Sequence, residues 1–229
     1  MFKIKKLGII GGMGPLATVR FFERIVNNTK AKRDQDHIDI VILNHSSLPD
    51  RTRIISEKKY DIFLKEIKKD FDILNQINVD NIVIPCNTSH FFIDEFKKMT
   101  NINIINMVEE TVSYIANSTD FKKIAVLGTL GTLNSKVYDR YIDKYQLENY
   151  TLTEEQKALT MDTIYNVKEK SIIQSKDLEE MILTLNNHKV MPILACTELS
   201  CLEFNNKDLK YIDAMDILTS KAIEKSIEI

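Results

Sequence analysis

Two halves of this chain repeat one order of motifs, and this repeat constrains the fold more than any other feature. In each half a short apolar run ends in a glycine turn, at residues 11–14 and again at 128–131. In each half a later apolar run ends in a cysteine followed by polar residues, at Cys86 and at Cys196. Because both pairs occur in the same order, we interpret the chain as two related halves. Chance similarity between the apolar strands of unrelated α/β halves is the alternative.

The spacing of apolar residues predicts a parallel sheet in each half. Short apolar runs predict buried strands, and apolar residues that recur every three or four positions predict helices. Strands that alternate with helices indicate parallel sheets covered on both faces, so we expect an α/β fold. The expected strands are residues 6–10, 38–43, 81–85, 103–106, 123–127, 190–194 and 210–213, and the expected helices are 15–26, 56–76, 89–99, 108–116, 133–145, 154–169, 177–185 and 216–227.

Charge and composition exclude several classes of function. A formal net charge of -2 and a pI of about 6.1 do not suit a nucleic-acid-binding surface or a polybasic membrane patch. No apolar run approaches the roughly 20 residues that a membrane span needs, and residues 1–6 do not begin a signal peptide, so we expect a cytoplasmic protein. Three cysteines predict no disulfide framework, and four scattered histidines predict no metal site.

The first glycine turn leaves two interpretations open. A glycine turn between a strand and a helix can present backbone N–H groups to an anion. Residues 11–14 match neither the dinucleotide-binding pattern G-x-G-x-x-G nor the P-loop, which disfavours a nucleotide site. A site for a small anion such as a carboxylate, and a tight turn without a binding role, are the two interpretations that remain.

Each cysteine of the repeat is expected at the carboxyl end of a parallel strand, where ligands bind in open α/β sheets. Polar residues follow at the expected start of a helix: Asn87 and Thr88 in the first half, Thr197 and Glu198 in the second. A helix N-terminus lowers the pKa of a nearby thiol. A single cysteine of this kind is more often a small buried hydrophobic residue. Two equivalent ones can instead face a ligand from opposite sides of a cleft.

Two opposed thiols suit racemisation. One thiolate can remove a proton from one face of a carbon, while the other thiol returns a proton to the opposite face. Backbone N–H groups aimed at a substrate carboxylate would stabilise the carbanion-like intermediate. Cys201 has no partner in the repeat, and we interpret it as structural. A reversible thiol redox pair is a competing hypothesis, but it needs sulfurs close enough to form a bridge.

With these motifs the sequence resembles the aspartate/glutamate racemase family over essentially its whole length. The resemblance implies two Rossmann-like (flavodoxin-like) α/β domains related by a pseudo-twofold axis, with the active site in the cleft between them. It implies a first domain of residues 1–108 plus 213–229 and a second of 109–212. It also implies a homodimer that acts on a small amino acid without a cofactor. The segments that carry the resemblance are residues 11–15, 48–52, 85–90, 128–132 and 195–199.

The resemblance also implies roles for individual residues. Cys86 and Cys196 match the catalytic pair of the family. Arg51 matches an arginine that meets a substrate carboxylate, and Lys168 resembles a second cationic contact. The positions that match residues binding the substrate or lining the pocket are Met13, Asn87, Thr88, Thr129, Thr132 and Thr197. The candidates for auxiliary roles are Gly12, His90, which either tunes Cys86 or packs, and Glu198, which is either an acid/base auxiliary or a helix-start residue.

Two departures from the family pattern bear on the substrate. Glutamate racemases of the family carry an acidic residue in the first glycine loop and a histidine after the second Cys-Thr, where this chain has Met13 and Glu198. We therefore expect PLP-independent racemisation of aspartate, with glutamate as a further substrate. The alternatives are an isomerase or decarboxylase of small dicarboxylic acids, similar to maleate isomerase, hydantoin racemase or malonate decarboxylase, and an amino-acid-binding protein without catalysis.

Overall fold

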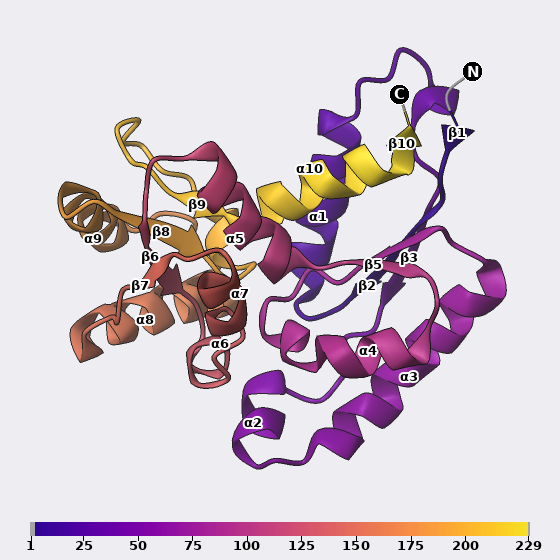
Figure 1. Ribbon diagram of the computed structural model, residues 1–229, viewed down its shortest axis with the longest axis horizontal. Helices are drawn as coiled ribbons and strands as arrows, with labels where there is room; N and C mark the ends of the chain where they lie inside the picture. Colours follow the sequence, from indigo (N-terminus) through magenta and orange to yellow (C-terminus); the bar gives the residue numbers. More distant parts are fainter. Residues whose placement is uncertain (1–2, 229) are drawn as a thin grey trace.

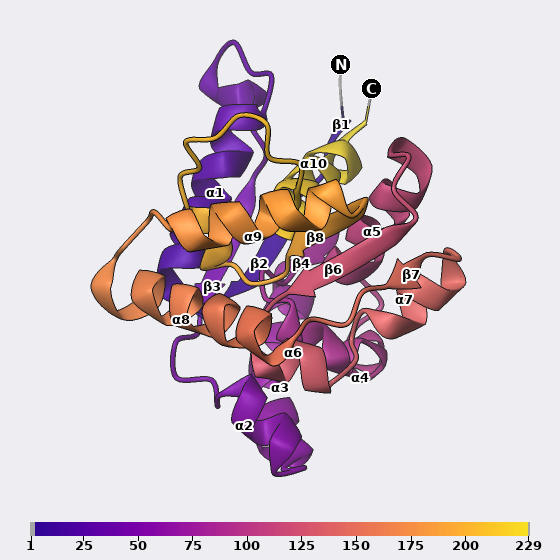
Figure 2. The same ribbon diagram turned by 90° about the vertical axis from the view of Figure 1, so that its left-hand side faces the viewer.

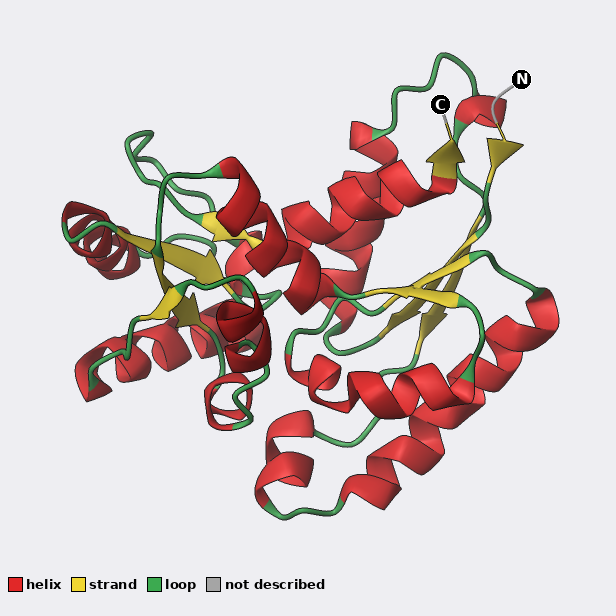
Figure 3. Cartoon of the chain, in the orientation of Figure 1, coloured by secondary structure: helices red, strands yellow, loops and turns green. Residues whose placement is uncertain are grey.

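The computed structural model describes residues 3–228, which form two four-stranded parallel sheets with helices around each (Figures 1 and 3). The strand order is β3-β2-β4-β5 in the first sheet and β7-β6-β8-β9 in the second. In both orders the glycine-turn strand lies beside the strand that leads to the paired cysteine. The same topology therefore occurs twice, and the expected α/β fold with two parallel sheets is confirmed.

The first sheet is built from the first half of the chain. Its central strands β2 and β4 are wholly buried, as expected for a sheet with helices on both faces. The strands are β2 (Leu7–Gly11), β3 (Ile40–Asn44), β4 (Asn81–Val83) and β5 (Asn103–Ile105). The helices of this half are α1 (Pro15–Asn28), η1 (Asp34–Asp36), α2 (Arg51–Ser56), α3 (Tyr60–Ile77), η2 (Thr88–Phe92), α4 (Ile93–Met99) and α5 (Met107–Ser118).

The second sheet uses the rest of the chain up to residue 213. Figure 2 shows α9 in front of β8, with α8 beside it. The strands are β6 (Lys123–Leu127), β7 (Glu148–Asn149), β8 (Val190–Leu194) and β9 (Ile212–Asp213). The helices are α6 (Leu130–Asn134), α7 (Asp139–Lys144), α8 (Glu154–Lys170), α9 (Lys176–Asn187) and η3 (Leu199–Cys201).

The last helix, α10 (Ala214–Ser226), returns to the first half. It packs against α1, α5 and β4, and it leads into β10 (Ile227–Glu228). β10 pairs antiparallel with β1 (Lys3–Ile4), so the two ends of the chain lie side by side (Figure 1). That the chain divides into domains after residue 108 and near residue 213 stays a prediction.

One apolar cluster joins the two halves. It contains Leu7 of β2, Ile124 of β6, Tyr141 of α7 and Met215 of α10, together with much of α5. Burial of each large apolar side chain contributes roughly 1.5–3 kcal/mol to the stability of the fold. A shared core of this kind holds the two sheets in a fixed relation, and the carboxyl ends of their strands are brought to one cavity.

Two expected helices are each interrupted. The helix predicted at residues 56–76 is α3 preceded by the separate helix α2, which begins early because the Asp50 side chain accepts a hydrogen bond from the backbone N–H of Arg53. Lys58 lies between the two helices with a φ of 53°. The helix predicted at residues 133–145 is likewise α6 and α7, separated near Lys136, which has a φ of 54°. A left-handed residue ends a helix whatever the apolar spacing around it.

The remaining differences are short elements. The helix expected at residues 89–99 begins as the 3-10 helix η2, and the two-residue strands β1, β7 and β10 carry too few residues for a pattern. Among residues 3–228, no helix combines the length and the apolar character needed to cross a bilayer.

Candidate active site

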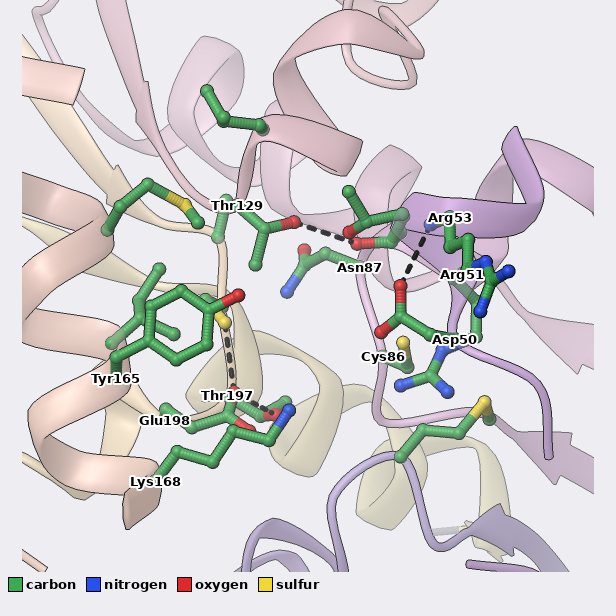
Figure 4. Close-up of a pocket in the computed structure, with 18 of the residues that line it drawn as sticks. Asp50, Arg51, Arg53, Cys86, Asn87, Thr129, Tyr165, Lys168, Thr197 and Glu198 are labelled. Carbon is green, nitrogen blue, oxygen red and sulfur yellow. Dashed lines mark hydrogen bonds between the residues drawn. The ribbon is translucent and has the colours of Figure 1, made fainter. Parts of the chain in front are cut away.

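A cavity of about 350 Å³ lies between the two halves, at the carboxyl ends of the strands (Figure 4). Residues that follow β2, β4, β6 and β8 all contribute to its wall. Figure 4 shows Tyr165 and Lys168 of α8 on one side and Arg51 with Cys86 on the other. The predicted site residues that line it are Met13, Arg51, Cys86, Asn87, Thr88, Thr129, Lys168, Cys196, Thr197 and Glu198. Gly12, His90 and Thr132 lie outside the lining.

Sequence reasoning missed a group of lining residues on α2 and α8. Met161, Ile164 and Tyr165 precede Lys168 at helical spacing, so they lie on the same face of α8. The position of Lys168 could therefore have predicted them as lining residues. On α2 the missed residues directly surround Arg51. The missed lining residues are Asp50, Thr52, Arg53, Ser56, Leu130, Met161, Ile164, Tyr165 and Ala195.

The two cysteines of the repeat line the cavity from opposite halves. Both thiols are buried and free of disulfide bonds. Cys196 donates a hydrogen bond from Sγ to Oε2 of Glu198, at 2.9 Å. Burial raises the pKa of Cys196 well above its ordinary value, and the nearby carboxylate of Glu198 raises it further.

The lowered pKa expected from a helix N-terminus is therefore wrong for Cys196. The element that follows it, η3, begins only at Leu199 and has three residues. Such a short element has little dipole to stabilise a thiolate, so burial and the nearby carboxylate decide the pKa. Cys196 consequently rests as a thiol, the form that can give a proton.

Two buried N–H donors on the first-half side of the cavity have no hydrogen-bond partner within residues 3–228. They are Nδ2 of Asn87 and Nε of Arg51. The Arg51 side chain donates only from Nη1, to the carbonyl of Pro49 at 3.2 Å. An unsatisfied buried donor costs about 1–3 kcal/mol. Donors kept in this state beside a cavity suit a ligand that carries acceptor oxygens, such as a carboxylate.

Hydroxyl groups from the two halves meet at one edge of the cavity. Thr88 Oγ1 lies 2.8 Å from Thr132 Oγ1, and Thr129 Oγ1 lies 3.4 Å from Thr88 Oγ1. Thr129 also caps α6, because its hydroxyl accepts from the backbone N–H of Thr132 at 3.2 Å. Thr132 therefore lies behind the lining and holds the hydroxyl of Thr88 from the other half.

The glycine turns have different local roles. Gly12 has a φ of +89°, and a Cβ there would lie 2.4 Å from the backbone carbonyl carbon of His45. Its N–H donates to Thr18 Oγ1 at 2.9 Å and is not free for an anion, which favours the tight-turn interpretation. In the second turn, a Cβ on Gly131 would lie 2.9 Å from Cα of Thr52. Gly131 thus permits the close approach of α6 to α2 across the two halves.

His90 is buried behind Cys86. Its Nδ1 lies 2.9 Å from the carbonyl oxygen of Cys86, and its Nε2 accepts from the backbone N–H of Met107 at 3.2 Å. Nδ1 therefore carries the ring proton. Burial lowers the pKa of His90 to about 4, so the ring is neutral near pH 7. The imidazole contacts the backbone of Cys86 and does not reach into the cavity.

A second set of contacts holds the segment after Cys196. Arg24 of α1 donates to the Ser200 carbonyl and to Asp213 Oδ2, the latter at 2.7 Å. The Ser200 hydroxyl donates to Asp213 Oδ1 at 2.6 Å.

Cys201 lies outside the cavity lining. Within the described part of the chain, no group of three or more His, Cys, Asp or Glu side chains could hold a metal ion.

Comparison with known proteins relates the whole chain to racemases. The model of the family described as Asp/Glu/Hydantoin racemase matches residues 10–222. The chain is 26% identical over 226 residues to the broad specificity amino-acid racemase RacX of Bacillus subtilis (strain 168), over 95% of this chain and 96% of that relative.

Solved structures show the same relationship. Aspartate racemase of Picrophilus torridus has a TM-score of 0.80 and 30% identity, and the match covers 98% of this chain and 96% of that chain. Glutamate racemase of Francisella tularensis, in complex with D-glutamate, has a TM-score of 0.64 and 19% identity, covering 96% of this chain and 80% of that chain. The second similarity concerns the fold.

Proposed function

Because the chain belongs to the Asp/Glu/Hydantoin racemase family, we propose that it interconverts L- and D-aspartate, with glutamate as a further substrate, by a two-base reaction of Cys86 and Cys196. The observation that carries this proposal is the cavity itself. Two buried thiols from opposite halves line it, together with two buried donors, on Arg51 and Asn87, that have no partner within residues 3–228.

In the proposed reaction Cys86 and Cys196 act on opposite faces of the substrate Cα. The Cys86 thiolate removes the Cα proton, and the bond electrons pass to a carbanion conjugated with the carboxylate. The Cys196 thiol then gives its proton to the other face, so Cys86 ends as thiol and Cys196 as thiolate. The raised pKa of Cys196 favours its role as the proton donor in this direction. Substrate and product are isomers, and no electrons are gained or lost.

Glu198 assists the second thiol. Its carboxylate already accepts the hydrogen bond from the Cys196 Sγ, at 2.9 Å. In the reverse direction Cys196 must lose its proton before it can act as a base, and Glu198 lies within reach to accept that proton. We therefore assign Glu198 the auxiliary acid/base role of the two that the sequence left open.

Donors around the cavity would bind the two carboxylates of aspartate. Asn87 Nδ2, with the hydroxyls of Thr88 and Thr197, binds the α-carboxylate and stabilises the charge that develops there. Arg51 and Lys168 bind the side-chain carboxylate from opposite sides of the cavity. Aspartate is preferred in this proposal because the aspartate racemase of Picrophilus torridus is 30% identical to this chain. Two further positions support the same choice. Where glutamate racemases of the family carry an acidic residue and a histidine, this chain has Met13 and Glu198.

Incubation with L-aspartate in deuterium oxide tests this function. We expect loss of the Cα proton signal in NMR spectra together with formation of D-aspartate. Formation of D-aspartate should be abolished in Cys86→Ala and in Cys196→Ala, because either variant lacks one of the two acid/base groups. Cys201→Ala, which removes the thiol outside the cavity, should stay active. Unchanged formation of D-aspartate in Cys86→Ala would contradict the mechanism. Conversion of maleate or malonate, without deuterium exchange at Cα of aspartate, would support the related isomerase or decarboxylase. Binding of aspartate without deuterium exchange would support a binding protein.

We also propose that the chain forms a homodimer, as the family resemblance implies. Light scattering of the purified protein should then give about twice the chain mass of 26.5 kDa. A mass that stays at that of one chain across protein concentrations would contradict the dimer.

A further inference from the structure

A buried hydrogen bond between the two halves holds the side chain of Asn87. Asn87 follows Cys86 in the first half, and Tyr138 immediately precedes α7 in the second. The Tyr138 hydroxyl lies 2.5 Å from Asn87 Oδ1. Both side chains are buried, with exposed fractions of 2% and 3%, and Tyr138 does not line the cavity.

The direction of this hydrogen bond follows from the surroundings of the hydroxyl. Within residues 3–228 the Tyr138 hydroxyl has no other hydrogen-bond partner. If the amide were reversed, Nδ2 would donate to the hydroxyl, whose own proton would then be buried without an acceptor. Donation from Tyr138 to Oδ1 gives the hydroxyl proton its acceptor, and the donor left without a partner is then Nδ2, which lies beside the cavity where a ligand can accept from it. Burial also raises the pKa of Tyr138, so the hydroxyl keeps its proton.

We propose that Tyr138 is a positioning residue that fixes the amide of Asn87 so that its N–H donors, and not its oxygen, face the substrate. Since Oδ1 is held by Tyr138, Nδ2 is left buried, without a partner among the described residues, and beside the cavity. Such a fixed donor favours a carboxylate over a carboxamide at that position, because a carboxylate only accepts hydrogen bonds. This inference rests on the proposed function for the identity of the ligand.

Tyr141 provides a matched control. Its hydroxyl accepts from Nδ2 of Asn106 at 2.6 Å, and this bond is also buried and also links the two halves. The Asn106 amide is oriented independently, because its Oδ1 accepts from the backbone N–H groups of Val108 and Glu109 at the start of α5. Neither Tyr141 nor Asn106 lines the cavity. Tyr141→Phe therefore removes a similar bond without altering the donors that face the ligand.

The test compares Tyr138→Phe with Tyr141→Phe. We expect Tyr138→Phe to raise the KM for L-aspartate roughly tenfold and also to lower kcat, because the Asn87 donor binds the α-carboxylate and stabilises the charge that develops on it. Calorimetry should measure the dissociation constants of L-aspartate and of its α-carboxamide. In Tyr138→Phe the ratio between these two constants should lie closer to one than in the wild type. Tyr141→Phe should keep the wild-type KM and preference. If Tyr138→Phe loses stability as Tyr141→Phe does but keeps the wild-type KM and the wild-type preference for L-aspartate over its α-carboxamide, the positioning role is wrong.

A second variant covers a failure of Tyr138→Phe to fold. Asn87→Asp keeps an acceptor for the Tyr138 hydroxyl and turns an oxygen toward the cavity, so it should bind aspartate at least tenfold more weakly. Undiminished binding would overturn the inference. The preference measured by calorimetry is a ratio of binding affinities and does not depend on whether the protein racemises aspartate. If the wild-type protein binds aspartate but does not racemise it, the proposed function fails, while a narrowed preference in Tyr138→Phe still supports the positioning role.

Discussion

The thiol of Cys196 donates a hydrogen bond to the carboxylate of Glu198, with 2.9 Å between Sγ and Oε2. Two residues that are almost adjacent in the chain thus form a hydrogen-bonded pair at the cavity wall. Burial keeps the proton on sulfur, and the negative charge of the carboxylate adds to this effect because it opposes a thiolate. Burial and this pairing therefore set the protonation state in which Cys196 would begin the proposed reaction.

Replacement of Glu198 should change both the titration and the rate. Glu198→Gln removes a negative charge beside Cys196, so the pKa of this thiol should fall toward its ordinary value, although burial still raises it. Its alkylation by iodoacetamide, followed by peptide mass spectrometry, should then begin at lower pH. Racemisation should fall roughly a hundredfold if Glu198 accepts the proton.

Glu203→Gln is the matched control for Glu198, since Glu203 is exposed and lies outside the cavity lining. It should leave both the alkylation profile of Cys196 and the rate unchanged. A Glu198→Gln enzyme with the wild-type rate and an unshifted profile would remove Glu198 from the mechanism.

His90 should make the stability of the fold depend on pH. Its pKa is about 4 in the folded protein, against 6.5 for an ordinary histidine. Between these values the unfolded chain binds a proton that the folded chain does not, so the free energy of unfolding falls as the pH falls. The loss is complete below about pH 4 and amounts to about 3 kcal/mol from this group.

Urea unfolding at pH 7 and at pH 4.5 measures this dependence. His90→Asn keeps a donor for the Cys86 carbonyl but cannot titrate, so its free energy of unfolding should vary less between the two pH values than that of the wild type. His188→Gln, which replaces an exposed histidine, should vary as the wild type does. Equal pH dependence in His90→Asn and the wild type would show that the ring is not buried in its neutral form.

The sequence patterns predicted local elements well and the contacts between the halves poorly. β6 and β8 have the predicted bounds, because each is a short apolar run that is buried throughout except at Lys123, the first residue of β6. The residues beside both cysteines were found because each follows such a strand. The hydroxyl of Tyr138, however, reaches Asn87 across 51 positions of the chain. No apolar period encodes that contact, since it depends on how α7 packs against the other half.

Gly12 should tolerate no side chain. A Cβ there would lie 2.4 Å from the His45 carbonyl carbon, and the φ of +89° is unfavourable for any other residue. Gly12→Ala should therefore lower the free energy of unfolding by about 2 kcal/mol or more, measured by urea titration. Gly14→Ala is the control, because its Cβ would meet only the end of the Glu198 side chain, at 3.3 Å. A loss in Gly12→Ala no larger than in Gly14→Ala would contradict the strained turn.

Arg51 should determine the preference for a second carboxylate. Its Nε is buried without a partner among residues 3–228, whereas Nε of the neighbouring Arg53 already donates to Glu57 at 2.7 Å. Arg51→Gln removes a charged donor that can form paired hydrogen bonds with a carboxylate, so the KM for aspartate should rise roughly 10- to 100-fold. Activity toward alanine, which lacks the side-chain carboxylate, should change much less.

Arg53→Gln separates the role of Arg51 from the general positive charge of α2. Both arginines line the cavity and either substitution removes one charge, but of the two only Arg51 has a buried donor without a partner in the described structure. Steady-state kinetics with aspartate and alanine should therefore show a lost preference in Arg51→Gln and at most a twofold change in Arg53→Gln. Equal effects of the two variants on the KM for aspartate would mean that charge alone attracts the substrate, and that the buried Nε of Arg51 does not bind its side-chain carboxylate.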